Sequence, residues 1–173
     1  GYSTWSNMKP DDTDLLSLPT HFPHLTKIRF TTWKVTDAGI AAFCEKMGDQ
    51  LKSIQISDSC ACNSKLSDET MRTMSRCCPN LERFDFDYRL LSRVPLLLTE
   101  RGLFALLEGC PKLTNLNIFH IGNIGLELFE HILENDSLQL KRMLVVGHDG
   151  LLKDEALCAR LEEKLEFFQA IDK

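Results

Sequence analysis

At 173 residues and 19.7 kDa, the chain is long enough for one domain or one short repeat array. Hydrophobic residues make up 43 %, which excludes wholesale disorder because so much apolar surface can form a continuous core. The net charge of −5 argues against nucleic acid as the main partner, because phosphate binding needs a basic surface. No apolar stretch approaches the roughly 18 residues of a membrane span.

The cysteine content indicates a reducing compartment. Seven cysteines are an odd number, and a chain of this size can fold without disulfides. We therefore expect reduced thiols and a cytoplasmic or nuclear location. Because the chain begins at Gly1 and not at a methionine, we expect it to be a fragment of a longer protein.

The chain opens with a polar, irregular segment. We expect residues 1–14 to form a linker or an N-terminal cap, with Trp5 as its anchor. Residues 15–25 predict the last turn of a helix followed by its closing motif, Phe22-Pro23-His24-Leu25. An array of about five repeats then covers residues 15–165 and starts part-way through a repeat.

A short strand motif recurs along this array. It has the form Leu-x-x-Φ-x-Φ, in which Φ is a large apolar residue, and it occurs five times at intervals of 26 to 32 residues. Alternating apolar residues predict strands with one buried face. The copies are Leu25-x-x-Ile28-x-Phe30, Leu51-x-x-Ile54-x-Ile56, Leu81-x-x-Phe84-x-Phe86, Leu113-x-x-Leu116-x-Ile118 and Leu140-x-x-Met143-x-Val145.

A helix signal follows each of the first three strands. A hydroxyl residue stands where an N-cap side chain can accept from the first helical N–H groups, and the acidic residue after it suits the helix dipole. Two of these helices end before a complete Cys-Pro-x-Leu motif, because proline cannot continue a helix. The starts are Val35-Thr36-Asp37-Ala38-Gly39-Ile40, Leu66-Ser67-Asp68-Glu69-Thr70-Met71 and Leu98-Thr99-Glu100-Arg101-Gly102-Leu103, and the ends are Cys78-Pro79-Asn80-Leu81 and Cys110-Pro111-Lys112-Leu113.

The last two repeats depart from this pattern. The fourth lacks the Thr-Asp signature, and its helix is predicted from about Ile124 to Glu134. The fifth has a charged helix through Leu165, which fits a terminal cap with a polar outer face. Residues 166–173 are expected to be a C-terminal tail in which Phe167 and Phe168 fold back onto that helix.

One strand and one helix per unit cannot bury their apolar faces alone, so neighbouring units must stack. The predicted fold class is α/β, a leucine-rich-repeat solenoid (horseshoe) with parallel strands on the concave face and helices on the convex face. The combined motifs resemble the cysteine-containing leucine-rich repeats of F-box/LRR proteins, the substrate receptors of SCF ubiquitin ligases, and of the F-box-less Amn1-like proteins. The resemblance covers roughly residues 15–165 and implies binding of a protein partner. The family's cysteine just after the strand is replaced here by Trp33 or Ser59.

Strand alternation predicts which residues face a partner. We expect partner-binding residues on the concave face and at the strand exits. The central column ends in Leu144, and the next column ends in Phe119 and Val146, so these three residues predict an apolar contact patch. The candidate residues are Arg29, Trp33, Gln55, Asp85, Asp87, Tyr88, Asn117, Phe119, His120 and Leu144.

Two alternatives stay open for this surface. The apolar patch is either a binding surface or a core region covered by the C-terminal segment. The leucine-rich insertion at 88–98 either carries recognition through Tyr88, Arg89 and Arg93 or extends the hydrophobic core.

Metal binding and catalysis are not expected. Cys60-Ala61-Cys62 and Cys77-Cys78 lack the Cys-x-x-Cys spacing and the histidine pair of a zinc site. His120, His148 and Asp149 have no nucleophile motif beside them, and no phosphate-binding glycine loop is present in the sequence. We expect no cofactor and no enzymatic activity.

Two functions remain. The first is a protein-interaction module that recognises substrates for an SCF-type ubiquitin ligase, joined to a Skp1-type adaptor through a missing upstream region. The alternative is a structural or scaffolding repeat domain of a larger assembly with no link to ubiquitin, in which binding would spread along the convex helices.

Overall fold

The computed structural model describes residues 2–5, 10–32, 34–58, 66–88, 97–119 and 124–171. In these residues seven parallel strands form one sheet, and their order in space follows their order in the chain. The strands are β1 (Tyr2–Trp5), β2 (Lys27–Thr31), β3 (Ser53–Asp58), β4 (Arg83–Tyr88), β5 (Asn115–Phe119), β6 (Arg142–Val146) and β7 (Phe167–Ile171). The α/β class predicted from the sequence is confirmed.

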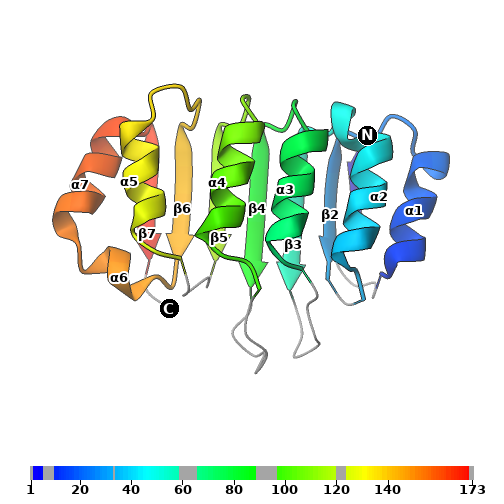
Figure 1. Cartoon of the computed structure of the whole chain (residues 1–173), viewed down its shortest axis with the longest axis horizontal. Helices are drawn as coiled ribbons and strands as arrows, with labels where there is room; N and C mark the ends of the chain where they lie inside the picture. The colour runs from blue at the N-terminus through cyan, green and yellow to red at the C-terminus, as the bar shows by residue number, and fades with distance from the viewer. Residues whose placement is uncertain are drawn as a thin grey trace.

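The helices lie side by side over one face of this sheet (Figure 1). They are α1 (Asp12–His21), α2 (Asp37–Met47), α3 (Asp68–Cys77), α4 (Glu100–Gly109), α5 (Glu127–Glu134), α6 (Asp149–Leu152) and α7 (Glu155–Lys164), with a short 3₁₀ turn, η1 (Gly48–Gln50), after α2. A parallel strand must be followed by a crossover before the next parallel strand, and one helix supplies most of these crossovers. No described element lies over the opposite face, which we call the open face.

The recurring apolar residues build a single core between the sheet and the helices. The leucine that begins each motif is buried just before its strand, and the two apolar residues inside each strand face the helices. The strand register stacks these residues into two rows that cross the sheet. The rows are Ile28, Ile54, Phe84, Leu116 and Met143, and Phe30, Ile56, Phe86, Ile118 and Val145.

The predicted N-caps are confirmed. The side chains of Thr36, Ser67 and Thr99 accept hydrogen bonds from the first-turn N–H groups of α2, α3 and α4. Helix α5 starts at Glu127, three residues later than the predicted Ile124. No side chain caps it, because Leu126 stands in the N-cap position.

The helix ends also follow the motifs. Cys78 and Cys110 are the C-cap residues of α3 and α4, and both side chains are buried. Their backbone N–H groups donate to helical carbonyls four residues earlier, and the proline that follows prevents further helix.

Both ends of the array differ from the sequence-based expectations. Helix α1 begins at Asp12, because Asp11 and Asp14 form a reciprocal capping box, and β1 pairs with β2 within the segment expected to be a linker or cap. At the other end, residues expected to be a tail form β7, which extends the sheet beside β6. Phe168 packs against the core, whereas Phe167 lies on the open face and is exposed.

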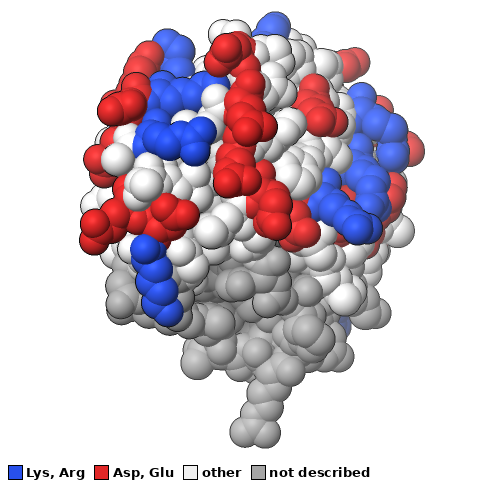
Figure 2. Space-filling model, turned by 60° about the vertical axis from the view of Figure 1, so that its left-hand side comes forward, with Lys and Arg blue, Asp and Glu red and all other residues white. Residues whose placement is uncertain are grey.

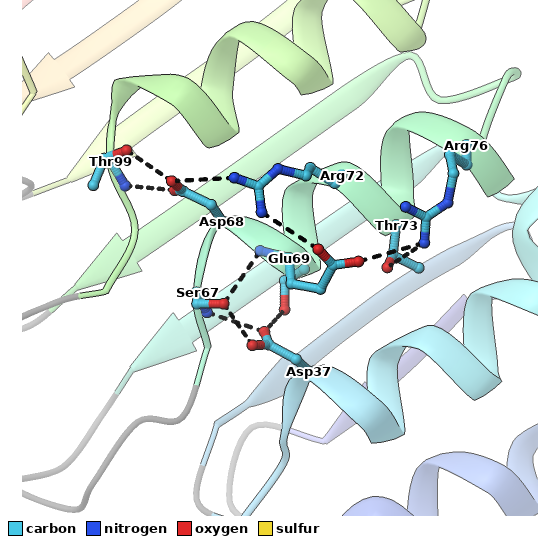
Figure 3. Close-up of polar contacts among 9 residues, drawn as sticks. Asp37, Ser67, Asp68, Glu69, Arg72, Thr73, Arg76 and Thr99 are labelled. Carbon is cyan, nitrogen blue, oxygen red and sulfur yellow. Dashed lines mark hydrogen bonds and ion pairs between the residues drawn. The ribbon is translucent and has the colours of Figure 1, made fainter.

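The repeats are joined by hydrogen bonds that the sequence analysis did not foresee. The aspartate at the start of one helix binds the N-cap residue of the next helix. Asp12 accepts from the backbone N–H and the hydroxyl of Thr36, at 2.8 and 2.7 Å, and Asp68 accepts from the same groups of Thr99, at 2.7 and 2.8 Å. Asp37 does the same for Ser67 (Figure 3). We call these contacts the aspartate ladder, and they connect α1 through α4.

Candidate functional site

The open face carries three rows of side chains, because residues on either side of each buried strand residue point away from the helices. Strand register aligns these rows across the sheet. The first row is Lys27, Ser53, Arg83, Asn115, Arg142 and Phe167; the second is Arg29, Gln55, Asp85, Asn117, Leu144 and Gln169; the third is Thr31, Ser57, Asp87, Phe119, Val146 and Ile171. Seven of the ten predicted binding residues lie in the second and third rows and share this one surface, namely Arg29, Gln55, Asp85, Asp87, Asn117, Phe119 and Leu144.

Asp85 is not the exposed carboxylate that the sequence predicts. Only 4 % of its surface is accessible, because its neighbours on the open face cover it. Arg83 Nε donates to both carboxylate oxygens at 2.9 and 3.1 Å, and Asn117 Nδ2 donates to Oδ1 at 2.7 Å. These contacts satisfy the negative charge within the sheet, so Asp85 positions Arg83 and Asn117 and is not itself a contact surface.

The apolar residues of the open face gather near β7. Phe119 and Val146 are neighbours in the third row, and both are half-buried, as is Leu144 in the second row. Ile171 extends the third row and is 39 % exposed. We call Phe119, Leu144, Val146 and Ile171 the apolar corner.

The position of the C-terminal segment distinguishes the two alternatives for this corner, a binding surface or a core region covered by that segment. A covering C-terminal segment would have to cross the open face, but β7 instead lies in the plane of the sheet and pairs with β6 over its whole length. Its side chains therefore widen the apolar corner, and within the described residues they do not cover it. An exposed apolar patch of this kind is typical of a contact surface.

Some predicted residues lie outside the described part of the chain. Trp33 and His120 are not described, nor are residues 89–96 of the insertion. Tyr88 is the last residue of β4, and its side chain is not described. The predictions made for these residues stay predictions.

The open face also carries a set of cations that was not predicted from the sequence. Lys27, Arg83 and Arg142 are exposed and occupy the first row, on alternate strands. A signal for them exists in the sequence, because each is the second variable residue of the Leu-x-x-Φ-x-Φ motif. That position lies directly before the first buried residue of the strand, so its side chain is the first of its strand on the open face.

The buried thiols are structural. Cys44, Cys78 and Cys110 are buried within the core between successive helices. A hydrogen bond with the Cys78 thiol and burial raise the pKa of Cys44 well above its usual value, and burial raises the pKa of Cys110 to about 12. The thiols of Cys44 and Cys110 therefore stay protonated at neutral pH and lack the thiolate that nucleophilic chemistry and metal binding need. The described residues contain no group of three or more potential metal ligands.

His148 also has a structural role. Its Nδ1 accepts from the Leu151 N–H at 2.9 Å, which caps α6, and its Nε2 lies 2.6 Å from the Ile124 carbonyl oxygen. The ring meets Phe129 edge-on, with centroids 5.3 Å apart. An imidazole whose two nitrogens are both engaged by backbone groups is not free to serve as a general base.

The helix side holds a small pocket at the ends of α4 and α5. It has a volume of about 280 Å³, and its lining includes Leu107, Glu108, Pro111, Ser137 and Leu138. Small-molecule sites usually measure about 300–1,000 Å³ and converge several polar groups on the ligand. This pocket is at the lower limit, so the open face is the stronger candidate site.

No protein-family model matches the chain, and no curated protein is significantly similar to it. Among the described helices, none combines the length and the apolar character that crossing a bilayer requires. The functional assignment therefore depends on the geometry of the chain itself.

Proposed function

We propose that this chain is a leucine-rich-repeat array of the cysteine-containing type, and that it binds another protein through its open face. The repeated unit supports the first half of the proposal. The units combine one parallel strand with one helix, and helices α2, α3 and α4 have a hydroxyl N-cap. Helices α3 and α4 also end at a buried cysteine. Stacked units of this kind offer a broad surface to a partner.

The observation that supports the binding function is the side-chain composition of the open face. A sheet face that only meets water is usually lined by polar residues, whereas this one joins exposed cations to a contiguous apolar corner. Apolar anchors surrounded by polar groups are the usual composition of a protein interface.

The narrower form of the proposal is substrate recognition for an SCF-type ubiquitin ligase, and it rests on the motif resemblance alone. The coding sequence upstream of Gly1 tests it. An F-box in that region together with capture of a Skp1-type adaptor supports the ligase form. Absence of both overturns it and leaves the binding module itself in place.

Affinity capture with quantitative mass spectrometry tests the binding function. The matched variants are Phe119→Asp in the apolar corner and Phe22→Asp, an exposed phenylalanine at the end of α1. We expect Phe119→Asp to lose captured proteins that Phe22→Asp retains, with both variants folded by circular dichroism. Equal capture by the two variants would overturn an open-face interface.

In the alternative function, a scaffolding repeat domain, the partner would bind the helices and not the open face. Figure 2 shows acidic side chains gathered in a band at the end of the molecule formed by α5 and α7. The exposed acidic residues of these two helices are Glu127, Glu130, Glu134, Glu155, Glu162 and Glu163. If the chain is a scaffold that binds through its helices, the charge reversal Glu130→Lys with Glu163→Lys removes partners that Phe119→Asp keeps.

A further inference from the structure

The basic residues of the open face form an ordered row. Lys27, Arg83 and Arg142 lie in register on β2, β4 and β6, and Ser53 and Asn115 separate them on β3 and β5. All three cationic side chains are exposed. We call these three residues the basic row.

Two of the three charges in the basic row have no ion-pair partner among the described residues, and the third, on Arg83, is paired with Asp85. Among the described residues, neither Lys27 nor Arg142 takes part in an ion pair, although Lys52 and Lys141, just before their strands, are paired with glutamates. Arg83 contacts Asp85 through Nε and still has 48 % of its side chain exposed. A protein with a net charge of −5 thus presents a positive stripe on one face, which attracts an anionic partner.

The spacing of the row fits one extended peptide conformation better than another. Neighbouring strands lie about 4.8 Å apart, so cations on alternate strands repeat about every 9.6 Å. A polyproline II segment has three residues per turn and a rise of 3.1 Å, so every third side chain points the same way about every 9.3 Å. A β-strand presents side chains on one face about every 6.6 Å and does not match the row.

We propose that the basic row binds an acidic peptide segment of a protein partner, which crosses the strands in polyproline II conformation with a carboxylate at every third residue. The row ends at Phe167 on β7, which is 37 % exposed and lies under the Arg142 guanidinium at 4.8 Å from the ring centroid. An apolar side chain of the peptide beside its last carboxylate contacts this ring. The proposal rests on the proposed function, because it names the partner chemistry of the same open face.

A nucleic acid is also anionic, but the observations favour an acidic peptide. Binding to nucleic acid depends on many phosphate contacts, and three cations are few against the negative charge of the whole chain. The acidic band on α5 and α7 would repel a long polyanion (Figure 2). The exposed ring of Phe167 adds an apolar contact that a phosphate backbone does not use.

Fluorescence anisotropy with labelled synthetic peptides tests this proposal. The probe has aspartates at every third position, prolines between them and a terminal leucine. A peptide of the same composition with aspartates at every second position, and a single-stranded oligothymidylate, are the comparisons. We expect the first peptide to bind at least about ten-fold more tightly than either comparison, and to weaken with added salt.

Matched variants locate the site. Lys27→Glu with Arg142→Glu reverses two charges of the basic row, and Lys46→Glu with Lys153→Glu reverses two exposed charges on the helix side. We expect the first pair to weaken the peptide about ten-fold or more and the second pair to leave it within about two-fold. If the glutamate pair does not fold, Lys27→Gln with Arg142→Gln gives the same comparison with a smaller effect.

The outcomes separate this inference from the proposed function. Equal binding of the two peptides, equal loss in both variant pairs, or tighter binding of the oligothymidylate overturns the acidic-peptide proposal. If Phe119→Asp still loses captured proteins in that case, the open face remains an interface for a partner of different chemistry. If capture does not depend on Phe119 either, both proposals fail.

Discussion

Replacement of Asp37 by alanine tests whether the aspartate ladder holds neighbouring repeats together. The Asp37 carboxylate accepts from the Ser67 N–H at 3.0 Å, from the Ser67 hydroxyl at 2.6 Å and from the Thr70 hydroxyl (Figure 3). Thr70 is fully buried, whereas Asp37 and Ser67 are partly accessible to water. The alanine variant therefore leaves one buried hydroxyl without its acceptor and lets water replace the other contacts.

The expected loss in the free energy of unfolding follows from these contacts. A hydrogen bond to a charged group contributes about 1.5–3 kcal/mol, and an unsatisfied buried group costs about 1–3 kcal/mol. Because the contacts share one carboxylate and are not additive, we expect Asp37→Ala to lower the free energy of unfolding by about 3 kcal/mol. For a chain of this length that loss lowers the melting temperature by about 6–12 °C.

Urea and thermal unfolding followed by circular dichroism measure this effect. The control is Asp136→Ala, which removes the same atoms from a side chain that is 96 % exposed and has one surface ion pair, with Lys164. We expect the control to leave the unfolding midpoint unchanged within error. Thr70→Val removes the buried hydroxyl, so its combination with Asp37→Ala should cost less than the sum of the two single changes.

A destabilisation by Asp37→Ala of less than about 0.5 kcal/mol would refute the reasoning, because that is the range of ordinary surface substitutions. Strict additivity of Asp37→Ala and Thr70→Val would refute the assigned contact. Either result would mean that stacking of the apolar rows alone couples the repeats.

Three further predictions follow from the packing. A Cβ at Gly48 would clash with the backbone carbonyl of Cys77, so Gly48→Ala should lower the melting temperature by several degrees. The control is Gly150→Ala, whose Cβ would meet nothing closer than 3.4 Å and which should leave the melting temperature unchanged. His148→Ala removes the side-chain cap of α6 and should cost about 1–2 kcal/mol in urea unfolding; an unchanged midpoint would contradict that role. The pKa of Cys110 is about 12 in the folded chain against 9.0 for a free thiol, so the unfolded chain loses this proton first and stability falls as pH rises from 9 towards 12. Cys110→Ala should therefore show a shallower loss of stability in that range, and identical slopes would contradict the burial of the thiol.

Strands β2 to β6 and helices α2 to α4 could be predicted from the sequence because their signals are local. The motif Leu81-x-x-Phe84-x-Phe86 repeats within a few residues, and an N-cap such as Thr99 lies next to the helix that it starts. The same alternation placed Phe119 and Leu144 on the face opposite the core. Each of these assignments depends on neighbours within about one turn or one strand.

Only the tertiary structure determined which side chains of the open face are exposed and which are covered by their neighbours. Asp85 is covered because Asn117, on the neighbouring strand, lies beside it, and sequence alternation does not show which groups meet across strands. The aspartate ladder likewise joins residues 24 to 33 positions apart, so Asp37 resembles an ordinary dipole-favoured residue until the helices are stacked.

Strand β7 is the clearest case of an element that the local sequence does not predict. The segment Phe167–Ile171 has no leucine motif ahead of it, and it becomes a strand because β6 offers an unpaired edge of backbone donors and acceptors. Local sequence thus determined the repeat and its core, whose signals lie within single units. Contacts between units determined which side chains are buried, which charges are compensated and where the array ends, because those properties depend on neighbours that the linear pattern does not bring together.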